Sequence, residues 1–324
     1  MIFNKRIVQS GAYPPNGTEW TVSNITSATF NAVHYANGVW VACSGSNAGL
    51  YYSTDGKTWT QSSVTNRSTY DVYYANGVWV AGSASGLYYS TNGKSWSISS
   101  NATGYFKEVH YANGVWVACS GSNAGLYYST DGKTWKQTNV TSYYFYGLHN
   151  ANGKWVVGSS EHGMYYSSDG KTWSQAGNTV SGSFHSTYYA NGIWVAGGYS
   201  SNGLLYSTDT YNWTKSNNTT GSFNAVYNAN GIWVACSTSS GLYYSTDGKT
   251  WTQSNITSGN YQCIYNANGM WIAGRSSSGI YYSNNGKTWT RSNVTTGTPK
   301  CFYNANGFFV AGIAGLYYSE SSYD

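Results

Sequence analysis

The triplet Ala-Asn-Gly recurs eight times along this chain of 324 residues, at intervals of 37 to 39 residues and without slippage. The copies begin at residues 36, 75, 112, 151, 190, 229, 267 and 305. Self-similarity at a fixed period of this size is typical of folds built from repeated supersecondary units. The chain is therefore interpreted as eight copies of one unit, although its length alone would also fit two ordinary domains.

Each copy contains four short stretches suited to β-strands. In the first copy they read FNAVHY, VWVACS, GLYYS and KTWTQS, and they are joined by ANG, a Ser/Gly-rich loop and TDG. Asn-Gly and Asp-Gly supply the positive φ angles of two-residue hairpin turns. The 34 tyrosines and 15 tryptophans favour strands and provide surface to bury. A repeated four-stranded antiparallel unit of about forty residues predicts an all-β fold, an eight-bladed β-propeller.

The two ends of the sequence predict how the ring closes. The eighth copy stops after GLYYSESSYD without a fourth strand, whereas residues 16–26, NGTEWTVSNIT, resemble a fourth strand with no strands before it. We expect this N-terminal strand to complete the last blade, which leaves no unpaired sheet edge at the seam. The predicted organisation is an N-terminal leader, residues 1–12, and a single propeller domain, residues 13–324.

The charge, the cysteine content and the apolar segments of the chain limit which partners and which location the sequence indicates. The five cysteines form no CxxC pair, so we expect free buried thiols. The net charge of +5 is a weak indication of a polyanion partner, and we expect neither nucleic-acid binding nor membrane insertion. The first residues are too few and too polar for a secretory signal. An extracellular or virion-associated location is nevertheless favoured, by analogy with Tyr- and Asn-rich propellers of phage tails and secreted surface structures.

A second motif lies between the third and fourth strands of each copy. STDGKTW occurs at 53–59, 129–135 and 245–251, with variants at 90–96, 167–173, 207–213 and 283–289. The motif resembles the Asp-box, or bacterial neuraminidase repeat, Ser-x-Asp-x-Gly-x-Thr-Trp, although here the glycine directly follows the aspartate. The resemblance implies a sialidase-like propeller. In physical terms the Asp caps backbone N–H groups, the Gly takes a positive φ and the Trp packs inward, so we expect a structural turn.

The predicted strand order divides the loops between two faces of the ring. The ANG and box turns share a nearly constant face, whereas the loops that enter the first strand and that join the second to the third share a varied face. Aligned on ANG, the copies give one polar column at the channel mouth of the varied face: Asn31, Tyr70, Lys107, Tyr146, His185, Asn224, Gln262 and Lys300. With Arg67 and Tyr144 from the adjoining loops, these are the predicted ligand-binding residues. That they only solvate the channel entrance stays an open alternative.

The sequence offers few residues that would support catalysis, a metal site or a cofactor. A glycosidase needs two opposed carboxyl groups, and Asp71 and Glu108, at equivalent positions of adjacent copies, are the one plausible pair. The arginine triad of a sialidase and the adjacent cysteine pair of a quinoprotein dehydrogenase are absent. His34, His110 and His149 alternate with Tyr at one position, which indicates packing rather than metal ligation. We therefore expect no catalytic residues, no metal site and no cofactor.

Six lysines follow the box glycine and should ring the constant face: Lys57, Lys94, Lys133, Lys171, Lys249 and Lys287. They could dock an anion, although solvated lysines are the more common case.

The function predicted from these observations is a non-catalytic binding module. A rim of Tyr, amide and Lys side chains suits a glycan or another cell-surface or virion ligand. The alternative is a structural or assembly scaffold that binds a protein partner, and a glycoside hydrolase is the less favoured third reading.

Overall fold

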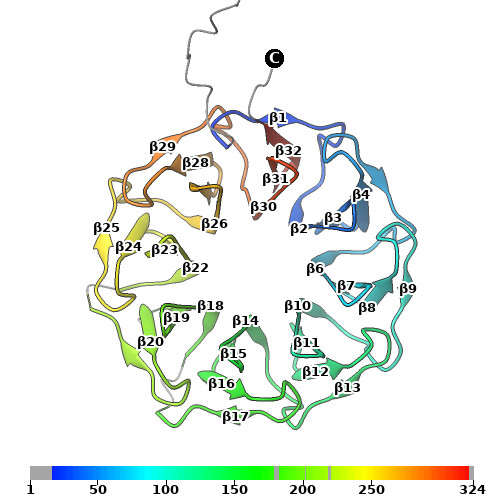
Figure 1. The fold of residues 1–324 in the computed structure, drawn as a ribbon, viewed down its shortest axis with the longest axis horizontal. Coiled ribbons are helices and arrows are strands. Elements are labelled where there is room, and N and C mark those ends of the chain that lie inside the picture. Colours follow the sequence, from blue (N-terminus) through cyan, green and yellow to red (C-terminus); the bar gives the residue numbers. More distant parts are fainter. Residues whose placement is uncertain (1–16, 179–181, 201, 218–219, 321–324) are drawn as a thin grey trace, which may run out of the picture.

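The computed structural model describes residues 17–178, 182–200, 202–217 and 220–320, and these form a closed ring of eight four-stranded antiparallel sheets (Figure 1). The predicted eight-bladed β-propeller is therefore confirmed. The predicted leader, residues 1–12, lies outside the described residues. Within the part of the chain that is described, no helix is long and apolar enough to cross a membrane.

The first strand of each blade faces the middle of the ring (Figure 1). These strands are β2 (Phe30–Ala36), β6 (Thr69–Ala75), β10 (Phe106–Ala112), β14 (Phe145–Ala151), β18 (Phe184–Ala190), β22 (Phe223–Ala229), β26 (Tyr261–Ala267) and β30 (Cys301–Ala305). The second strands are β3 (Val39–Ser44), β7 (Val78–Ser83), β11 (Val115–Ser120), β15 (Lys154–Ser159), β19 (Ile193–Gly198), β23 (Ile232–Ser237), β27 (Met270–Arg275) and β31 (Phe308–Ile313).

The third and fourth strands form the outer half of each blade. The third strands are β4 (Leu50–Ser53), β8 (Gly86–Ser90), β12 (Leu126–Ser129), β16 (Met164–Ser167), β20 (Leu204–Ser207), β24 (Leu242–Ser245), β28 (Gly279–Ser283) and β32 (Gly315–Glu320). The fourth strands are β5 (Thr60–Gln61), β9 (Ser97–Ile98), β13 (Lys136–Gln137), β17 (Ser174–Gln175), β21 (Thr214–Lys215), β25 (Thr252–Gln253), β29 (Thr290–Arg291) and β1 (Thr21–Val22).

The fourth strands are shorter than the sequence predicts. We expected strand character over the whole of KTWTQS, but β5 starts only at Thr60. Lys57, Thr58 and Trp59 belong to the box turn, because the Asp55 carboxylate already holds the Lys57 and Thr58 amides. Those two N–H groups are thereby withdrawn from the strand ladder.

The box turn has the predicted hydrogen bonds. Asp55 Oδ1 accepts from the amides of Lys57 (2.8 Å) and Thr58 (2.7 Å), and from the Ser53 hydroxyl (2.8 Å). Gly56 has a φ of 74°, where a side chain is strained. The buried Trp59 donates its indole N–H to the Gly56 carbonyl (3.0 Å). The aspartate and glycine therefore build the turn, and the tryptophan anchors it to the core.

The hydrophobic core consists of eight clusters, and each cluster joins two neighbouring blades. The cluster between the first and last blades shows the pattern: Trp40 and Trp59 of the first blade pack with Phe308 and Val310 of the last. The second strands are almost fully buried because both of their faces lie between sheets. Burial of aromatic surface between blades is therefore what holds the ring together.

The N-terminal strand closes the ring as predicted. Strand β1 pairs with β32, with Thr21 opposite Tyr318 and Val22 opposite Tyr317. The last box is assembled from both ends of the described chain, since Gly17 N donates to Ser319 Oγ (2.8 Å). Trp20 is 5% exposed and packs against Phe302 and Phe309 at centroid distances of 6.0 and 6.2 Å.

Candidate functional site

A closed circle of eight aromatic side chains runs around the middle of the ring, one from each first strand. Neighbouring ring centroids are 4.6 to 6.1 Å apart all the way round. The members, in order, are His34, Tyr73, His110, His149, Tyr188, Tyr227, Tyr265 and Tyr303. Each also meets an aromatic ring of the adjoining blade nearly edge-on, as His34 meets Trp79. We call this set the aromatic circle.

The three histidines of the aromatic circle serve as aromatic packing groups, as predicted. Burial lowers the pKa of His34, His110 and His149 to about 4, and neighbouring His110 lowers that of His34 and His149 further. The imidazoles are therefore neutral at pH 7. Among the described residues, no group of three or more His, Cys, Asp or Glu is placed to hold a metal ion. The five cysteines, all described, are free thiols.

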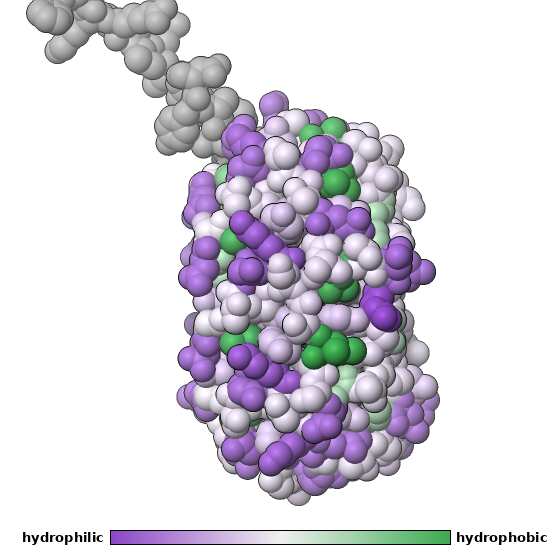
Figure 2. All heavy atoms as spheres, turned by 90° about the vertical axis from the view of Figure 1, so that its right-hand side faces the viewer, coloured by the Kyte–Doolittle hydropathy of each residue, from purple (hydrophilic) through white to green (hydrophobic). Residues whose placement is uncertain are grey.

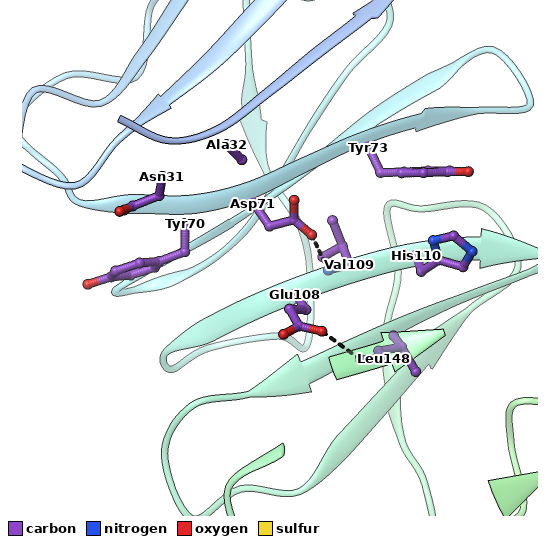
Figure 3. A pocket seen from close by; sticks show the side chains of 9 residues that line it. All are labelled: Asn31, Ala32, Tyr70, Asp71, Tyr73, Glu108, Val109, His110 and Leu148. Atoms are coloured by element: carbon purple, nitrogen blue, oxygen red, sulfur yellow. Dashed lines mark hydrogen bonds between the residues drawn. The ribbon is translucent and has the colours of Figure 1, made fainter. Parts of the chain in front are cut away.

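A cavity of about 450 Å³ lies against the first strands of the first four blades, beside the aromatic circle. Figure 3 shows Asn31 and Tyr70 at one end of it and Tyr73 and His110 at the other, with Asp71 and Glu108 between them. The end marked by Asn31 and Tyr70 opens on the varied face, because these residues are near the start of their strands. The cavity thus connects the predicted mouth with the aromatic circle.

Asp71 and Glu108 each bind the backbone of the next blade. Asp71 Oδ2 accepts from Val109 N (2.9 Å), and the two oxygens of Glu108 accept from Gly147 N (2.8 Å) and Leu148 N (2.7 Å). Burial raises the pKa of Asp71 to about 6 and of Glu108 to about 7, against the opposing effect of these N–H donors. Both carboxyl groups therefore connect neighbouring blades through backbone hydrogen bonds.

The predicted column lies at the start of the first strands, and a β-bulge orients most of its side chains. In six blades the pairing register skips one residue, as between Phe30 opposite Ser44 and Ala32 opposite Cys43, so that a column residue is the extra residue of a β-bulge. These residues are Asn31, Tyr70, Lys107, His185, Asn224 and Gln262. Bulges re-aim side chains and are common beside binding sites. In β14 the skip follows Tyr146, and Lys300 precedes β30.

Half of the column forms a continuous aromatic arc. Lys107 Nζ lies 4.4 Å from the centroid of the Tyr146 ring and 5.8 Å from that of Tyr105. His185 is stacked between Tyr146 at 4.5 Å and Tyr199 at 4.4 Å. Tyr70 meets Tyr105 edge-on at 4.6 Å and begins the arc. The arc therefore spans four blades and is held in place before any ligand arrives.

The other half of the mouth is built from amides and a lysine. Asn224 donates to Asn260 Oδ1 (3.1 Å), and Gln262 donates to the same oxygen. Lys300 donates to Asn31 Oδ1 (3.3 Å), which links the last blade to the first. The mouth thus has one aromatic side and one amide-rich side.

Two of the predicted residues lie outside this contact chain. Arg67 is exposed and donates to Ser85 Oγ (2.8 Å). Tyr144 is 42% exposed and borders a separate cavity of about 290 Å³, where the tilted rings of Tyr143 and His162 lie with their centroids 3.8 Å apart. This second cavity is also on the varied face, since it is bordered by loops that enter β14 and follow β15.

Sequence reasoning missed Tyr105, Tyr199 and Asn260, which the structure places in contact with the column. Tyr105 and Asn260 stand two residues before a column residue, as Tyr144 does, so a second aligned column would have found them. Tyr199 follows a second strand and has no such signal.

The constant face and the outer rim of the ring have fewer features of a binding site than the varied face has. All six box lysines lie over tyrosine rings of the preceding blade, at 5.4 to 5.9 Å, rather than standing free. Figure 2 views the rim from the side of the first blades, and hydrophobic residues appear there as separate spots among polar ones. Isolated apolar residues of this kind are normal on a protein surface.

Comparisons with known proteins identify the architecture and no family. No family model matches the chain, and no curated protein matches its sequence. The computationally designed protein Ika8 has a similar structure, with a TM-score of 0.76 at 8% identity, covering 94% of this chain and 100% of that one. BamB from Moraxella catarrhalis is also similar, with a TM-score of 0.67 at 12% identity, covering 93% of this chain and 99% of that one.

A structure of YCF48 bound to D1 peptide is also similar, with a TM-score of 0.62 at 14% identity, covering 98% of this chain and 100% of that one. At these identities the likeness concerns the fold alone. What the comparisons show for this chain is the β-propeller fold, and the ligand has to be inferred from the site.

Proposed function

We propose that this protein is a non-catalytic binding module that takes a glycan of a cell or virion surface at the mouth of its varied face. The observation that carries the proposal is the pre-formed rim, in which the column residues contact one another or their loop neighbours. Two of them, Asn31 and Tyr70, also border the cavity of about 450 Å³. A rigid concave site with many hydroxyl, amide and ammonium groups suits a polyhydroxylated ligand.

The packing of the arc limits how a sugar can bind. Both faces of His185 are covered by neighbouring rings, and Tyr146 is covered by Lys107 and His185. Stacking on a sugar ring is therefore left to the ends of the arc, Tyr70 and Tyr199. The tyrosine hydroxyls and the amide-rich side supply hydrogen bonds, which are the main source of sugar specificity.

A glycan array tests the proposal, with the wild-type protein, Tyr70→Ala, Tyr199→Ala and the matched control Tyr211→Ala. Tyr211 is 49% exposed in a box turn of the constant face. We expect the two mouth variants to lose binding by roughly tenfold or more, because each removes a stacking ring, and the control to retain it. Failure of the wild-type protein to bind any glycan, together with a stable protein complex, would favour the assembly scaffold instead.

The hydrolase alternative rests on Asp71 and Glu108, and their backbone clamps speak against it. We expect no turnover of aryl glycosides by the wild-type protein. Turnover that Asp71→Asn abolishes would overturn the non-catalytic assignment.

We further propose that the turns are of the Asp-box type, shortened by one residue. The shared Ser, Asp, Gly and Trp hydrogen bonds support this assignment.

A further inference from the structure

The box lysines make the same contact at six of the eight blade interfaces. In each case Nζ lies 5.4 to 5.9 Å from the centroid of a third-strand tyrosine of the preceding blade. The pairs are Lys57 with Tyr318, Lys94 with Tyr52, Lys133 with Tyr89, Lys171 with Tyr128, Lys249 with Tyr206 and Lys287 with Tyr244. At a seventh interface Tyr211 takes the place of the lysine and meets Tyr166 edge-on at 6.3 Å.

The eighth interface, where the ring closes, has a threonine at the lysine position. Gly17 N donates to Ser319 Oγ and Trp20 donates to Gly17 O, as Gly56 and Trp59 do in a complete box. Thr18 therefore occupies the position of Lys57. Its side chain is too short to reach over the ring of Tyr282, which is the equivalent tyrosine of the preceding blade.

A cavity of about 480 Å³ stands where the other interfaces have their lysine. It is lined by Thr18, Glu19, Tyr282, Asn284, Arg291, Ser292 and Asn293. Thr18 is 9% exposed, and its buried Oγ1 has no hydrogen-bond partner.

The cavity wall carries one carboxylate, that of Glu19, and one guanidinium, that of Arg291. Glu19 is exposed and supplies a carboxylate at the cavity wall. The guanidinium of Arg291 donates to backbone carbonyls, with Nη2 3.2 Å from Ser278 O and a further bond to Thr295 O. The aromatic face of a tyrosine is a common setting for an ammonium group.

We propose that this seam cavity binds the ammonium group of a lysine side chain from a partner protein, in the position that the chain's own lysines occupy at six other interfaces. The class of ligand follows from those interfaces, whose spacing already fits an ammonium over a tyrosine. The site lies on the opposite face from the glycan mouth, and neither proposal depends on the other.

The test is an NMR titration of the full chain with Nα-acetyl-lysine methylamide, following the backbone amides of Glu19, Tyr282 and Ser283. A single cation–π contact supports only weak affinity, so we expect shifts that follow a binding curve with a Kd of about 30 to 400 mM. The Nε-acetylated probe, which lacks the charge, should cause no saturable shift at these amides.

Two variants make the test specific. Thr18→Lys should place an ammonium over Tyr282, raise the Tm by about 1–2 °C and abolish probe binding. Glu19→Lys changes an exposed side chain, so it should keep the fold and also abolish binding by repulsion. The proposal is overturned by the absence of shifts at these amides up to about 1 M probe, by unchanged binding in both variants, or by equal binding of the acetylated probe.

Discussion

At the scale of single residues, the aromatic circle explains why histidine and tyrosine alternate at one position of the repeat. Both present a flat ring to the two neighbouring blades, and the contacts of His34 with Tyr73 and of Tyr73 with His110 are nearly alike, at 5.0 and 4.8 Å. The sequence predicts the exchangeability of these residues. It does not predict the closed circle, because that contact depends on the radius of the ring.

We predict that the three buried imidazoles make the fold sensitive to acid. Their folded-state pKa of about 4 lies below the ordinary 6.5, so the unfolded chain binds more protons between these values, and stability is lost as the pH falls from 6.5 to 4. Replacing His34, His110 and His149 together by tyrosine should reduce that loss by on the order of several kcal/mol. Urea unfolding of the wild-type protein and of the triple variant at pH 7 and pH 4.5 measures the loss of stability in each. Equal losses in both proteins would show that the imidazoles are protonated in the folded state.

Asp71 and Glu108 affect the pH dependence of stability in the opposite direction. Their folded-state pKa values are raised, so the stability that they contribute is complete at low pH and declines as the pH rises through about 6 to 7. The wild-type protein and the triple tyrosine variant both contain Asp71 and Glu108, so the effect of these residues cancels when the two proteins are compared. The sequence marks them as an unusual acidic pair, but their clamping role depends on the backbone of the next blade.

At the scale of the element, the box turn was largely predictable, because its chemistry is local. Ser, Asp and Gly at fixed spacing define the capping bonds, whereas the length of the fourth strand was overestimated since capping competes with the ladder. Two of the boxes already carry asparagine in place of the aspartate. Asn92 and Asn285 make the same two backbone bonds in their boxes, at 2.8 to 2.9 Å.

We predict that Asp131→Ala lowers the free energy of unfolding by about 1–2 kcal/mol, because the amides of Lys133 and Thr134 lose their acceptor. Asp131→Asn should stay within about 0.5 kcal/mol of the wild type, since the amide oxygen keeps both bonds. Chemical denaturation of the two variants measures the difference. An asparagine variant as unstable as the alanine variant would mean that the charge, not the acceptor, holds the turn.

At the scale of the whole molecule, closure depends on contacts between the first and last described strands. Asn293 binds the Trp20 backbone in both directions, accepting from its N–H at 2.9 Å and donating to its carbonyl at 3.0 Å. The repeat count and the two incomplete ends were sufficient to predict this seam. The mouth was less predictable, because Tyr199 comes from a loop with no repeat pattern.

We predict that Trp20→Ala releases the N-terminal strand, because its indole is the main apolar anchor of that strand. Hydrogen exchange of residues 17–26 should rise by roughly tenfold or more. Trp251→Ala removes another buried box tryptophan from a blade with no chain end, and it should leave the hydrogen exchange of residues 17–26 unchanged. Equal exchange of that segment in both variants would mean that closure does not depend on Trp20.

The most direct test of the central claim, that the mouth of the varied face binds the ligand, is a hydrogen-exchange footprint of the protein with its best glycan. We predict slower exchange around Tyr70, Lys107, Tyr146, His185 and Tyr199, with the box turns unchanged. Protection confined to the box turns or to the outer rim would contradict the account.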